Sequence, residues 1–481
     1  MMVVEEQIDA RIDGAHGEHE ADLPIGEHGE ASGAAQMGDG PRAIQRRVLG
    51  LAGPVIGENL LETMLGLVDT LLVAGLGAAA IAGVGSALQV MFFLISMLSA
   101  LAVGASVLVA QAVGASDTRR ASRLARQSLL WSALLSIPLA ILGLLLSGTI
   151  IGTFGLEPDV AQVATSYLEV TMGTVVVLVA LFIGGGVLRG AGDSRTPMVV
   201  TAIANVVNVG LAYAMIYGHF GLPALGTVGS AWATFLARAL ALVLLVGALW
   251  RGRNGVSIGV SAGRSWMPSF GVARDVLRIG VPAALEQVLV SSAFFALTII
   301  VAHLGTEVLA AHRIAFNALS LSFLPGIGFG IAATALVGQS VGARRIEEGA
   351  AATRIATIWA VAWMSAIALA ILIFAEPIMR LYTNDPAVIA AGAAGLRVVA
   401  LAQPFWGVLF VQSGGLRGTG NTRFPLWTTG GGIWLSVGLS YALIQWIGGG
   451  LASVWAGFLI LAPFMAALHW WRFRRTVREE M

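Results

Sequence analysis

The sequence predicts an all-α integral membrane protein with twelve transmembrane helices in two pseudo-symmetric six-helix lobes. Three observations support this fold class: an apolar composition, a regular alternation of long apolar segments with short polar breaks, and an internal repeat. Of the 481 residues, 57% are hydrophobic and 11% are charged. Globular proteins carry about 25% charged residues, so this composition indicates a chain that lies largely within a membrane.

Twelve long apolar segments follow Arg46. They cover residues 48–74, 80–112, 124–148, 160–183, 197–217, 224–249, 276–303, 308–340, 354–375, 387–412, 425–446 and 450–471. A helix of about 20 apolar residues crosses the roughly 30 Å hydrocarbon core of a bilayer. Each segment is long enough to span it.

The two halves of the chain repeat at a constant offset, which is the separation in sequence between Pro54 and Pro282. This repeat offset also pairs Glu58 with Glu286, Gln111 with Gln339, and Trp131 with Trp359. The stretch LRGAGDSRTP at 188–197 returns as LRGTGNTRFP at 416–425. A register without gaps indicates duplication. Each half has six spans, so both have the same topology and an axis along the membrane normal relates them.

The repeat and the composition divide the chain into five parts. These are a disordered acidic N-terminal tail at 1–44, a six-helix lobe at 45–250, a cytoplasmic linker at 251–275, a second lobe at 276–472 and a cytoplasmic tail at 473–481. Residues 1–41 hold ten acidic residues, and Arg11 is their only basic residue apart from histidines. A segment of this composition is too polar to fold alone. Its histidines, His16, His19 and His28, leave weak metal binding as an alternative to a plain disordered tail.

Arginine alternates between the polar breaks. One set of breaks carries two to five arginines each, whereas the other set carries only Arg380 together with several acidic residues. The positive-inside rule makes the first set cytoplasmic. We therefore expect both termini to be cytoplasmic, in a multi-pass protein of the cell (plasma or inner) membrane.

The first apolar segment carries an acidic stripe formed by Glu58, Glu62 and Asp69. A helix advances about 100° per residue, so these three carboxylates fall within about 40° of one another. A single carboxylate at the bilayer centre costs roughly 2.5–3.5 kcal/mol, so the stripe must face protein or water and is a functional-site candidate. We take Glu58, Glu62 and the repeated Glu286 as candidates for a substrate cavity. The alternative is that Glu58 and Glu62 lie near headgroups or pair with an arginine.

Two repeated features have a structural and a functional interpretation. Pro54 lies inside the first span, where a proline makes either a static kink or a hinge beside the carboxylates. The motif LRGxG(D/N)(S/T)RxP predicts a hairpin capped by Asp193 or Asn421, with Pro197 and Pro425 in the first turn of the next helix. We expect its arginines to anchor at phosphate headgroups, and the alternative is that the motif contacts substrate.

The residue inventory excludes several classes of chemistry. There is no cysteine for disulfides or thiol catalysis, and no lysine for a Schiff base or a phosphate-binding loop. No nucleotide-binding loop, metal-ligand cluster or nucleophile–base pair is present in the spans. We therefore expect no enzymatic activity, no cofactor and no nucleic-acid partner.

Four stretches together resemble the MATE (multidrug and toxic compound extrusion) family. They are VDTLLVAGLGAAAIAGVG, VLRGAGDSRTP, LAAHRIAFNALSLSFLPGIGFGIAATALVGQSVGA and GGLRGTGNTRFP, and the resemblance extends over about 45–471. The resemblance implies two six-helix lobes that form a V around a central cavity. It also implies export of organic, often cationic, compounds, driven by inward movement of H⁺ or Na⁺.

The resemblance assigns roles to individual residues. Asp69 matches the first-helix carboxylate implicated in cation coupling, and Pro54 matches the proline at which that helix bends. Tyr167, Asn208 and Thr234 match the polar neighbours of that carboxylate.

Two positions depart from the pattern of some members. Ala212 replaces a second acid, and Trp406 stands nearest to an aspartate of the tenth span. These losses remove oxygen ligands, of which a metal cation needs several, so H⁺ is favoured over Na⁺ as the coupling ion. They also make the chain more similar to the DinF-like branch of the family than to the NorM-like one.

The function expected from these features is secondary-active, cation-coupled export of multiple drugs or organic cations by alternating access. We expect small organic, cationic substrates, contact with membrane lipids and a monomeric state. The alternative is a flippase for lipids or lipid-linked oligosaccharides from the same wider superfamily, whose cavity would be strongly basic. A channel or a structural membrane protein is a further alternative, but neither needs carboxylates beside a proline in a duplicated architecture.

Overall fold

The computed structural model describes residues 40–259, 267–448 and 450–481, and it is helical over most of each predicted span. The first half contains α1 (Pro41–Ala74), α2 (Ala78–Gly114), α3 (Thr118–Gly152), α4 (Pro158–Gly173), α5 (Val175–Gly190), α6 (Arg195–Tyr217) and α7 (Gly226–Arg251). The second half contains α8 (Phe270–Ala302), α9 (Thr306–Gly342), α10 (Ile346–Arg380), α11 (Pro386–Gly418), α12 (Arg423–Pro425), the π-helix η3 (Leu426–Gly430), α13 (Gly431–Ile447) and α14 (Leu451–Glu480).

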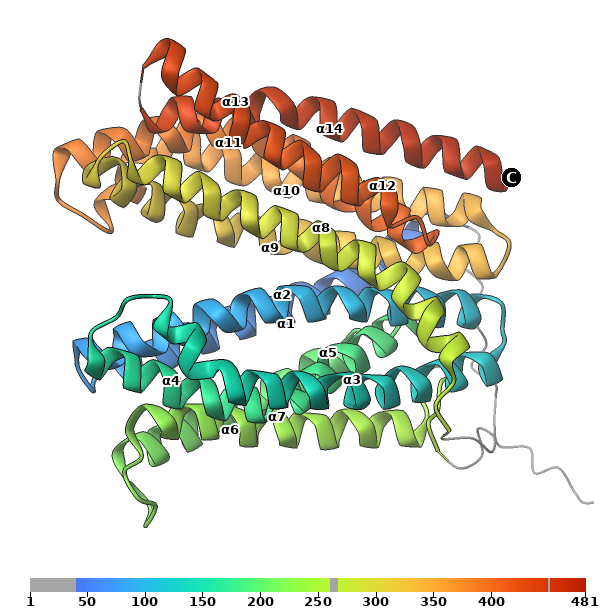
Figure 1. Cartoon of the computed structure of the whole chain (residues 1–481). Helices are drawn as coiled ribbons and strands as arrows, with labels where there is room; N and C mark the ends of the chain where they lie inside the picture. The colour runs from blue at the N-terminus through green and yellow to red at the C-terminus, as the bar shows by residue number, and fades with distance from the viewer. Residues whose placement is uncertain (1–39, 260–266, 449) are drawn as a thin grey trace, which may run out of the picture.

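The helices account for the expected spans. Ten helices of the described chain are long and apolar enough to cross a membrane, and the bent pair α4–α5 adds an eleventh span. The contiguous helical segment Arg423–Ile447, made of α12, η3 and α13, occupies the place of the remaining one. The prediction of an all-α membrane protein in two six-helix lobes is confirmed, and Figure 1 shows the blue-to-green lobe beside the yellow-to-red lobe.

The repeat found in the sequence is also present in the helix boundaries. The repeat offset carries both ends of α2 onto the ends of α9, and both ends of α3 onto those of α10. The uninterrupted helix α11 corresponds in the same way to α4 and α5 together.

The fourth span departs from the continuous helix that we expected. Thr174 has φ −106° and ψ 7°, and the two helices on either side of it meet at a bend of 53°. The Thr174 hydroxyl donates to the Val170 carbonyl at 2.8 Å. Such a back-bond from threonine to the preceding turn bends helices, which gives a local reason for the break.

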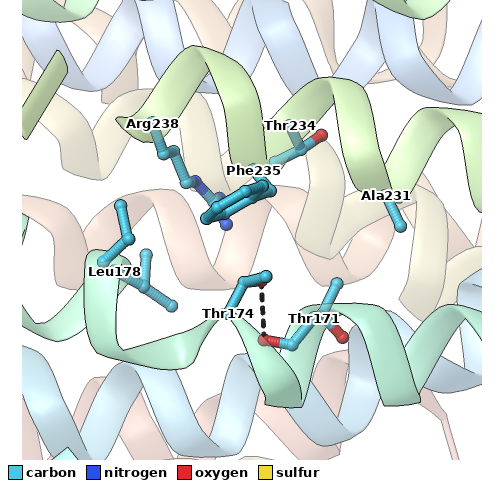
Figure 2. A pocket seen from close by; sticks show the side chains of 8 residues that line it. Thr171, Thr174, Leu178, Ala231, Thr234, Phe235 and Arg238 are labelled. Atoms are coloured by element: carbon cyan, nitrogen blue, oxygen red, sulfur yellow. Dashed lines mark hydrogen bonds between the residues drawn. The ribbon is translucent and has the colours of Figure 1, made fainter. Parts of the chain in front are cut away.

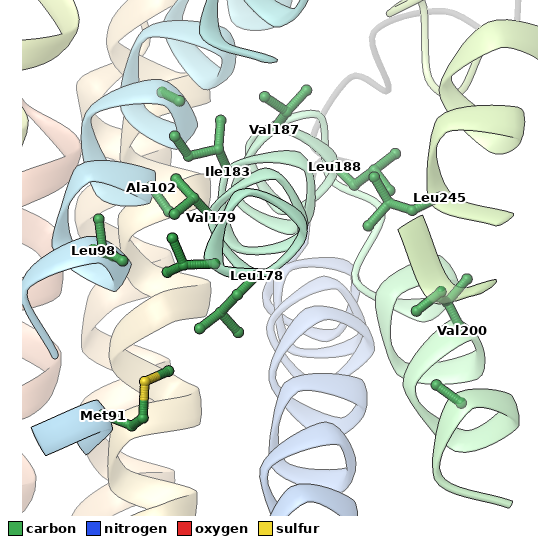
Figure 3. Close-up of a cluster of buried hydrophobic side chains, with 14 of the residues drawn as sticks. Met91, Leu98, Ala102, Leu178, Val179, Ile183, Val187, Leu188, Val200 and Leu245 are labelled. Atoms are coloured by element: carbon green, nitrogen blue, oxygen red, sulfur yellow. The ribbon is translucent and has the colours of Figure 1, made fainter. Parts of the chain in front are cut away.

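Each lobe has its own apolar core. In the first lobe, side chains of α5 pack against α2 on one side and against α6 and α7 on the other, as Figure 3 shows. Leu98 and Ala102 on α2 face Val179 and Ile183 on α5. A separate core around Trp455 and Phe458 fills the second lobe.

The first turns of α1 and α8 cross between the lobes. Val48, Leu51 and Ala52 of α1 are buried against α9 and α10 of the second lobe. The beginning of α8 packs reciprocally on α2 and α3 of the first lobe, and Figure 1 shows α8 starting beside α3. Both helices begin at the end of the bundle where α14 finishes, which we call the arginine-rich end.

The boundaries of the linker and tails differ from the predicted ones. The linker starts as an ordered hairpin, in which Val256 and Ile258 are buried and the Ser257 N–H donates to the Ser122 hydroxyl at 3.0 Å. Helix α8 begins within the predicted linker, and α14 continues through most of the predicted C-terminal tail. Helix α1 begins at Pro41, inside the predicted N-terminal tail. The rest of that tail, with its histidines, lies outside the described residues.

The hairpins of the repeated motif form as expected. Asp193 Oδ1 accepts from the Thr196 N–H at 2.9 Å, and Asn421 Oδ1 accepts from the Phe424 N–H at 3.2 Å. These short polar side chains accept hydrogen bonds from backbone N–H groups in the first turn of the following helix and so cap it.

Candidate functional site

Four helices of the first lobe bring together the residues predicted to couple cations. Asp69 on α1 lies against the Thr234 hydroxyl of α7. Asn208 of α6 donates through Nδ2 to Thr234 Oγ1 at 3.1 Å. The Tyr167 ring of α4 is buried close enough to Asp69 and Ser230 to interact with both. We call Asp69, Tyr167, Asn208 and Thr234 the Asp69 cluster.

Two oxygen atoms of the Asp69 cluster have unused hydrogen-bonding capacity. Asp69 Oδ1 and Asn208 Oδ1 are buried and have no hydrogen-bond partner among the described residues. Buried polar atoms are normally satisfied, so an unsatisfied pair in one cluster indicates a place where a proton, water or small cation can bind.

Arg238 of α7 is part of the same site, although sequence reasoning did not select it. Its guanidinium group lies close enough to Asp69 to interact with it electrostatically. The signal was available, because Arg238 lies midway along an apolar span and an intramembrane arginine is itself a functional candidate. Its proximity to Asp69, however, depends on the packing of α1 with α7.

A pocket next to the Asp69 cluster lies between α7 and the break between α4 and α5, and it shares Thr234 with the cluster. Its cavity volume is about 10 Å³, and its lining includes Thr171, Thr174, Thr234, Phe235 and Arg238. Figure 2 shows Phe235 and Arg238 extending from α7 toward the two threonines on the facing helix. Sites for drug-sized ligands contain about 300–1,000 Å³, so this pocket suits water or an ion better than a drug-sized substrate.

The other two acids of the stripe lie nearer the arginine-rich end. Glu58 is paired with Arg189 of α5 at 3.0 Å, and only 13% of its side chain is exposed. Glu62 is exposed, and the charges of Glu58, Arg238 and Arg189 act on it. The stripe therefore places three carboxylates against two guanidinium groups, which leaves one negative charge for a proton or a cation to balance.

Glu286 is a buried, ion-paired residue and not, as we expected, a residue that faces a substrate cavity. It is buried on α8 and forms an ion pair of 2.8 Å with Arg417 of α11. Arg417 and Arg189 are the first arginines of the two LRGxG motifs. The prediction that the motif arginines anchor at headgroups is therefore wrong for these two, because each faces a carboxylate on a neighbouring helix.

The second lobe provides an internal comparison for the Asp69 cluster. At the repeat offset, Leu297 replaces Asp69, Gly395 replaces Tyr167, and Ser436 replaces Asn208. Leu297 is fully buried in an apolar core. Helix α14, the counterpart of α7, has no charged residue between 451 and 468. Duplication preserved the helices, whereas the polar cluster is confined to the first lobe.

Pro54 and Pro282 lie where α1 and α8 pass from one lobe to the other. Residues before Pro54 pack on the second lobe, whereas Glu58 after it pairs with the first lobe. Residues before Pro282 pack on the first lobe, and Glu286 after it pairs with the second. Each proline therefore divides its helix into two segments that are held by different lobes.

The lobes are joined near the arginine-rich end by a reciprocal set of contacts. Gln111 of α2 donates to the Gly418 carbonyl at 3.2 Å, and its counterpart Gln339 of α9 donates to the Gly190 carbonyl at 2.9 Å. Arg47 donates to Gln339 Oε1 at 2.6 Å. These residues lie at or near helix ends, so the contacts hold one end of the two lobes together.

Two repeated helical lobes, joined at one end and carrying an intramembrane acidic cluster in one of them, define a polytopic membrane protein of the secondary-transporter type. The family model described as MatE matches residues 54–214 and 282–442, one match in each half. The chain belongs to this family.

Relatives and solved structures of the family extend over most of the chain. It is 31% identical over 88% of its length to a probable multidrug resistance protein NorM of Thermotoga maritima, of which 91% is covered. It is 30% identical over 92% of its length to a multidrug resistance protein NorM of Burkholderia vietnamiensis, of which 97% is covered. A structure described as the outward-facing conformation of a multidrug resistance MATE family transporter superposes with a TM-score of 0.84 at 25% identity, covering 93% of this chain and 99% of that one. The assignment to the DinF-like branch stays a prediction.

Proposed function

We propose that this protein is a secondary-active exporter of multiple small organic compounds, and that inward movement of H⁺ through the Asp69 cluster drives export. The observation that carries the proposal is the unpartnered, buried Asp69 Oδ1 in a stripe with one excess negative charge. A carboxyl group in this position can bind and release one proton for each transport cycle. The multidrug resistance names of the relatives support the substrate class.

The substrate is proposed to bind between the lobes and not in the first-lobe pocket. That pocket is smaller than the sites that hold drug-sized ligands. The lobes are joined at the arginine-rich end, which we take to be cytoplasmic, so the space between them would open outward in this conformation. Excess negative charge beside that space favours cationic substrates by charge complementarity.

Sodium is the second candidate for the coupling ion. The unpartnered Asn208 Oδ1 supports it, because Na⁺ binds through oxygen ligands and the Asp69 cluster offers more than one. Arg238 opposes it, because the guanidinium already places a positive charge beside Asp69. Ala212 also contributes no oxygen from its fully buried side chain on α6.

One experiment separates these functions. The purified protein is reconstituted in proteoliposomes, and uptake of a cationic dye is followed under an imposed H⁺ gradient, an imposed Na⁺ gradient, or neither. Dye accumulation that requires the H⁺ gradient supports the proposal. Accumulation that requires only the Na⁺ gradient would show that Na⁺, and not H⁺, is the coupling ion. A protein that moves a fluorescent lipid between leaflets but never concentrates the dye would be a flippase, and the proposal would be wrong.

A further inference from the structure

A groove at the arginine-rich end lies outside the site described above. It has a volume of about 800 Å³, is open on one side, and lies between α3, α8 and α12. Its lining combines three arginines, Arg274, Arg278 and Arg423, with an apolar wall that includes Trp131 and Leu277. The groove therefore joins strong positive charge to apolar surface.

The positive charge of the groove is not neutralised within the described protein. Arg274, Arg278 and Arg423 are all exposed, and none of them forms an ion pair with a described carboxylate. No acidic side chain belongs to the lining, although Asp275 is exposed next to Arg274. Three guanidinium groups around one opening make it complementary to an anion, because arginine binds phosphate through paired N–H donors.

The apolar wall of the groove is held rigidly in place. Gln127 of α3 donates to the Met267 carbonyl at 2.8 Å and accepts from the Ser269 N–H at 2.8 Å. Trp131 donates through Nε1 to the Ser269 carbonyl at 3.2 Å, and its ring meets Phe270 edge-on at 5.2 Å. These contacts fix the start of α8 against α3, so the groove is a built feature of this conformation.

The surface beyond the arginines is apolar and follows the same face of α8. Arg274, Arg278, Val281 and Leu285 lie within about 60° of one another around the helix. Val281 and Leu285 are 42% and 50% exposed, and Leu135 on α3 is 47% exposed. This face of α8 is charged near the arginine-rich end and becomes apolar toward the middle of the bundle. A bilayer changes in the same order, from polar headgroups to apolar acyl chains.

We propose that this groove binds an anionic phospholipid, with the phosphate among Arg274, Arg278 and Arg423 and an acyl chain along Val281, Leu285 and Leu135. A soluble phosphate would use only the arginines, whereas a phospholipid uses both the charge and the apolar face. The bound lipid would touch α3 of the first lobe and α12 of the second lobe at once.

The test measures lipid binding to the purified full-length protein in detergent by native mass spectrometry. Phosphatidylglycerol and phosphatidylcholine with identical acyl chains are titrated separately, and free sn-glycerol 1-phosphate is the soluble competitor. The groove variant is Arg274→Gln/Arg278→Gln/Arg423→Gln. The control variant is Arg119→Gln/Arg120→Gln/Arg123→Gln, which removes three exposed positive charges from the same end at the start of α3.

The wild-type protein is expected to prefer phosphatidylglycerol, and the groove variant to lose roughly a hundredfold in affinity for it, since each basic side chain near an anionic surface contributes about fivefold. The control variant is expected to keep the preference. The variant Val281→Gln/Leu285→Gln is expected to weaken binding of both lipids. It tests the apolar surface proposed to hold the acyl chain, and it removes no charge.

Three results would overturn the proposal. The groove variant could keep the preference for phosphatidylglycerol, or the control variant could lose as much affinity as the groove variant. Free glycerol phosphate could displace the lipid at equal concentration, which would make the groove a site for a soluble anion. This last measurement uses only the wild-type protein, so it holds even where a variant fails to fold.

Discussion

Glu286 and Arg417 form an ion pair of 2.8 Å in the second lobe, and the repeat offset relates them to Glu58 and Arg189, which pair at 3.0 Å in the first. In each lobe the carboxylate lies four residues after a proline that marks the passage of its helix between lobes. The pair therefore holds the helix to its own lobe just beyond the crossing point. Duplication has kept this anchor in both lobes, whereas the Asp69 cluster exists in only one.

The first prediction concerns the stability of these two anchors. Glu286→Gln should lower stability by about 1–3 kcal/mol, because it leaves the Arg417 charge without its carboxylate in a mostly buried position. Glu58→Gln should cost less, because the Glu58 side chain is 13% exposed and that of Glu286 only 4%. Thermal unfolding of the purified proteins in one detergent gives the comparison.

The double variant Glu286→Gln/Arg417→Gln provides the control for this prediction. It removes both charges and should be more stable than Glu286→Gln alone. A double variant that is less stable than the single one by the full cost of Arg417→Gln would show that the two residues do not interact.

The second prediction concerns the contact between α2 and α9. A Cβ atom at Gly342 would overlap the backbone of Gln111, and one at Gly114 would overlap the backbone of Gln339. Gly342→Ala should therefore force the lobes apart at the arginine-rich end, at a cost of about 1–3 kcal/mol. Spin labels on cysteines at the exposed positions 119 and 347, on α3 and α10, should report a longer distance by pulsed electron resonance.

Gly210→Ala is the matched control for the second prediction, because no atom lies within 4 Å of the added Cβ. It should leave the distance between the labels unchanged. An unchanged distance in Gly342→Ala as well would mean that the contact yields locally without separating the lobes.

Much of the architecture could be predicted from the sequence because the physics involved is local or periodic. Span length follows from bilayer thickness, and the repeat follows from the constant offset. The hairpin caps at Asp193 and Asn421 depend only on residues two or three positions away. The bend at Thr174 was missed because threonine in an apolar span is common and its back-bond alone does not specify a break.

The parts that could not be predicted depend on helices far apart in the chain. Glu58 and Arg189 are 131 positions apart, so their pairing requires knowledge of how α1 packs on α5. The proximity of Arg238 to Asp69 could not be predicted for the same reason, since Asp69 lies six helices earlier. The grouping of Asp69 with Tyr167, Asn208 and Thr234 came from the family resemblance, and the structure brings these residues together. Their role in coupling stays a prediction.

The third prediction concerns orientation in the membrane. Thr306→Cys at the start of α9 should react with a membrane-impermeant maleimide on intact cells, and Ala115→Cys after α2 should react only in inside-out vesicles. Both positions are exposed, and the protein has no other cysteine. Ser122 is a poor reporter because it is buried and accepts a hydrogen bond from Ser257. The reverse labelling pattern would invert the assigned topology.

The last prediction concerns the role of Asp69 in coupling. Asp69→Asn keeps the size of the side chain and mimics the protonated carboxyl group, but it cannot release a proton. It should fold, because it removes a charge from the membrane and Thr234 can still bond to the amide. In proteoliposomes it should fail to concentrate a cationic dye under an imposed H⁺ gradient. Glu62→Gln removes a carboxylate from the same face of α1 but outside the Asp69 cluster, and its effect should be milder.

The physical reason for this expectation is the position of Asp69 relative to the crossing point of α1. Asp69 lies fifteen residues beyond Pro54, about 22 Å along the helix. Protonation of Asp69 changes its hydrogen bonds to the other residues of the Asp69 cluster. The segment of α1 beyond Pro54 is held to the first lobe through that cluster and through the ion pair of Glu58 with Arg189. A change in those bonds can therefore alter the bend at Pro54 and, with it, the affinity for a cationic substrate. Asp69→Asn protein that still accumulates the dye against its gradient would show that another residue carries the coupling.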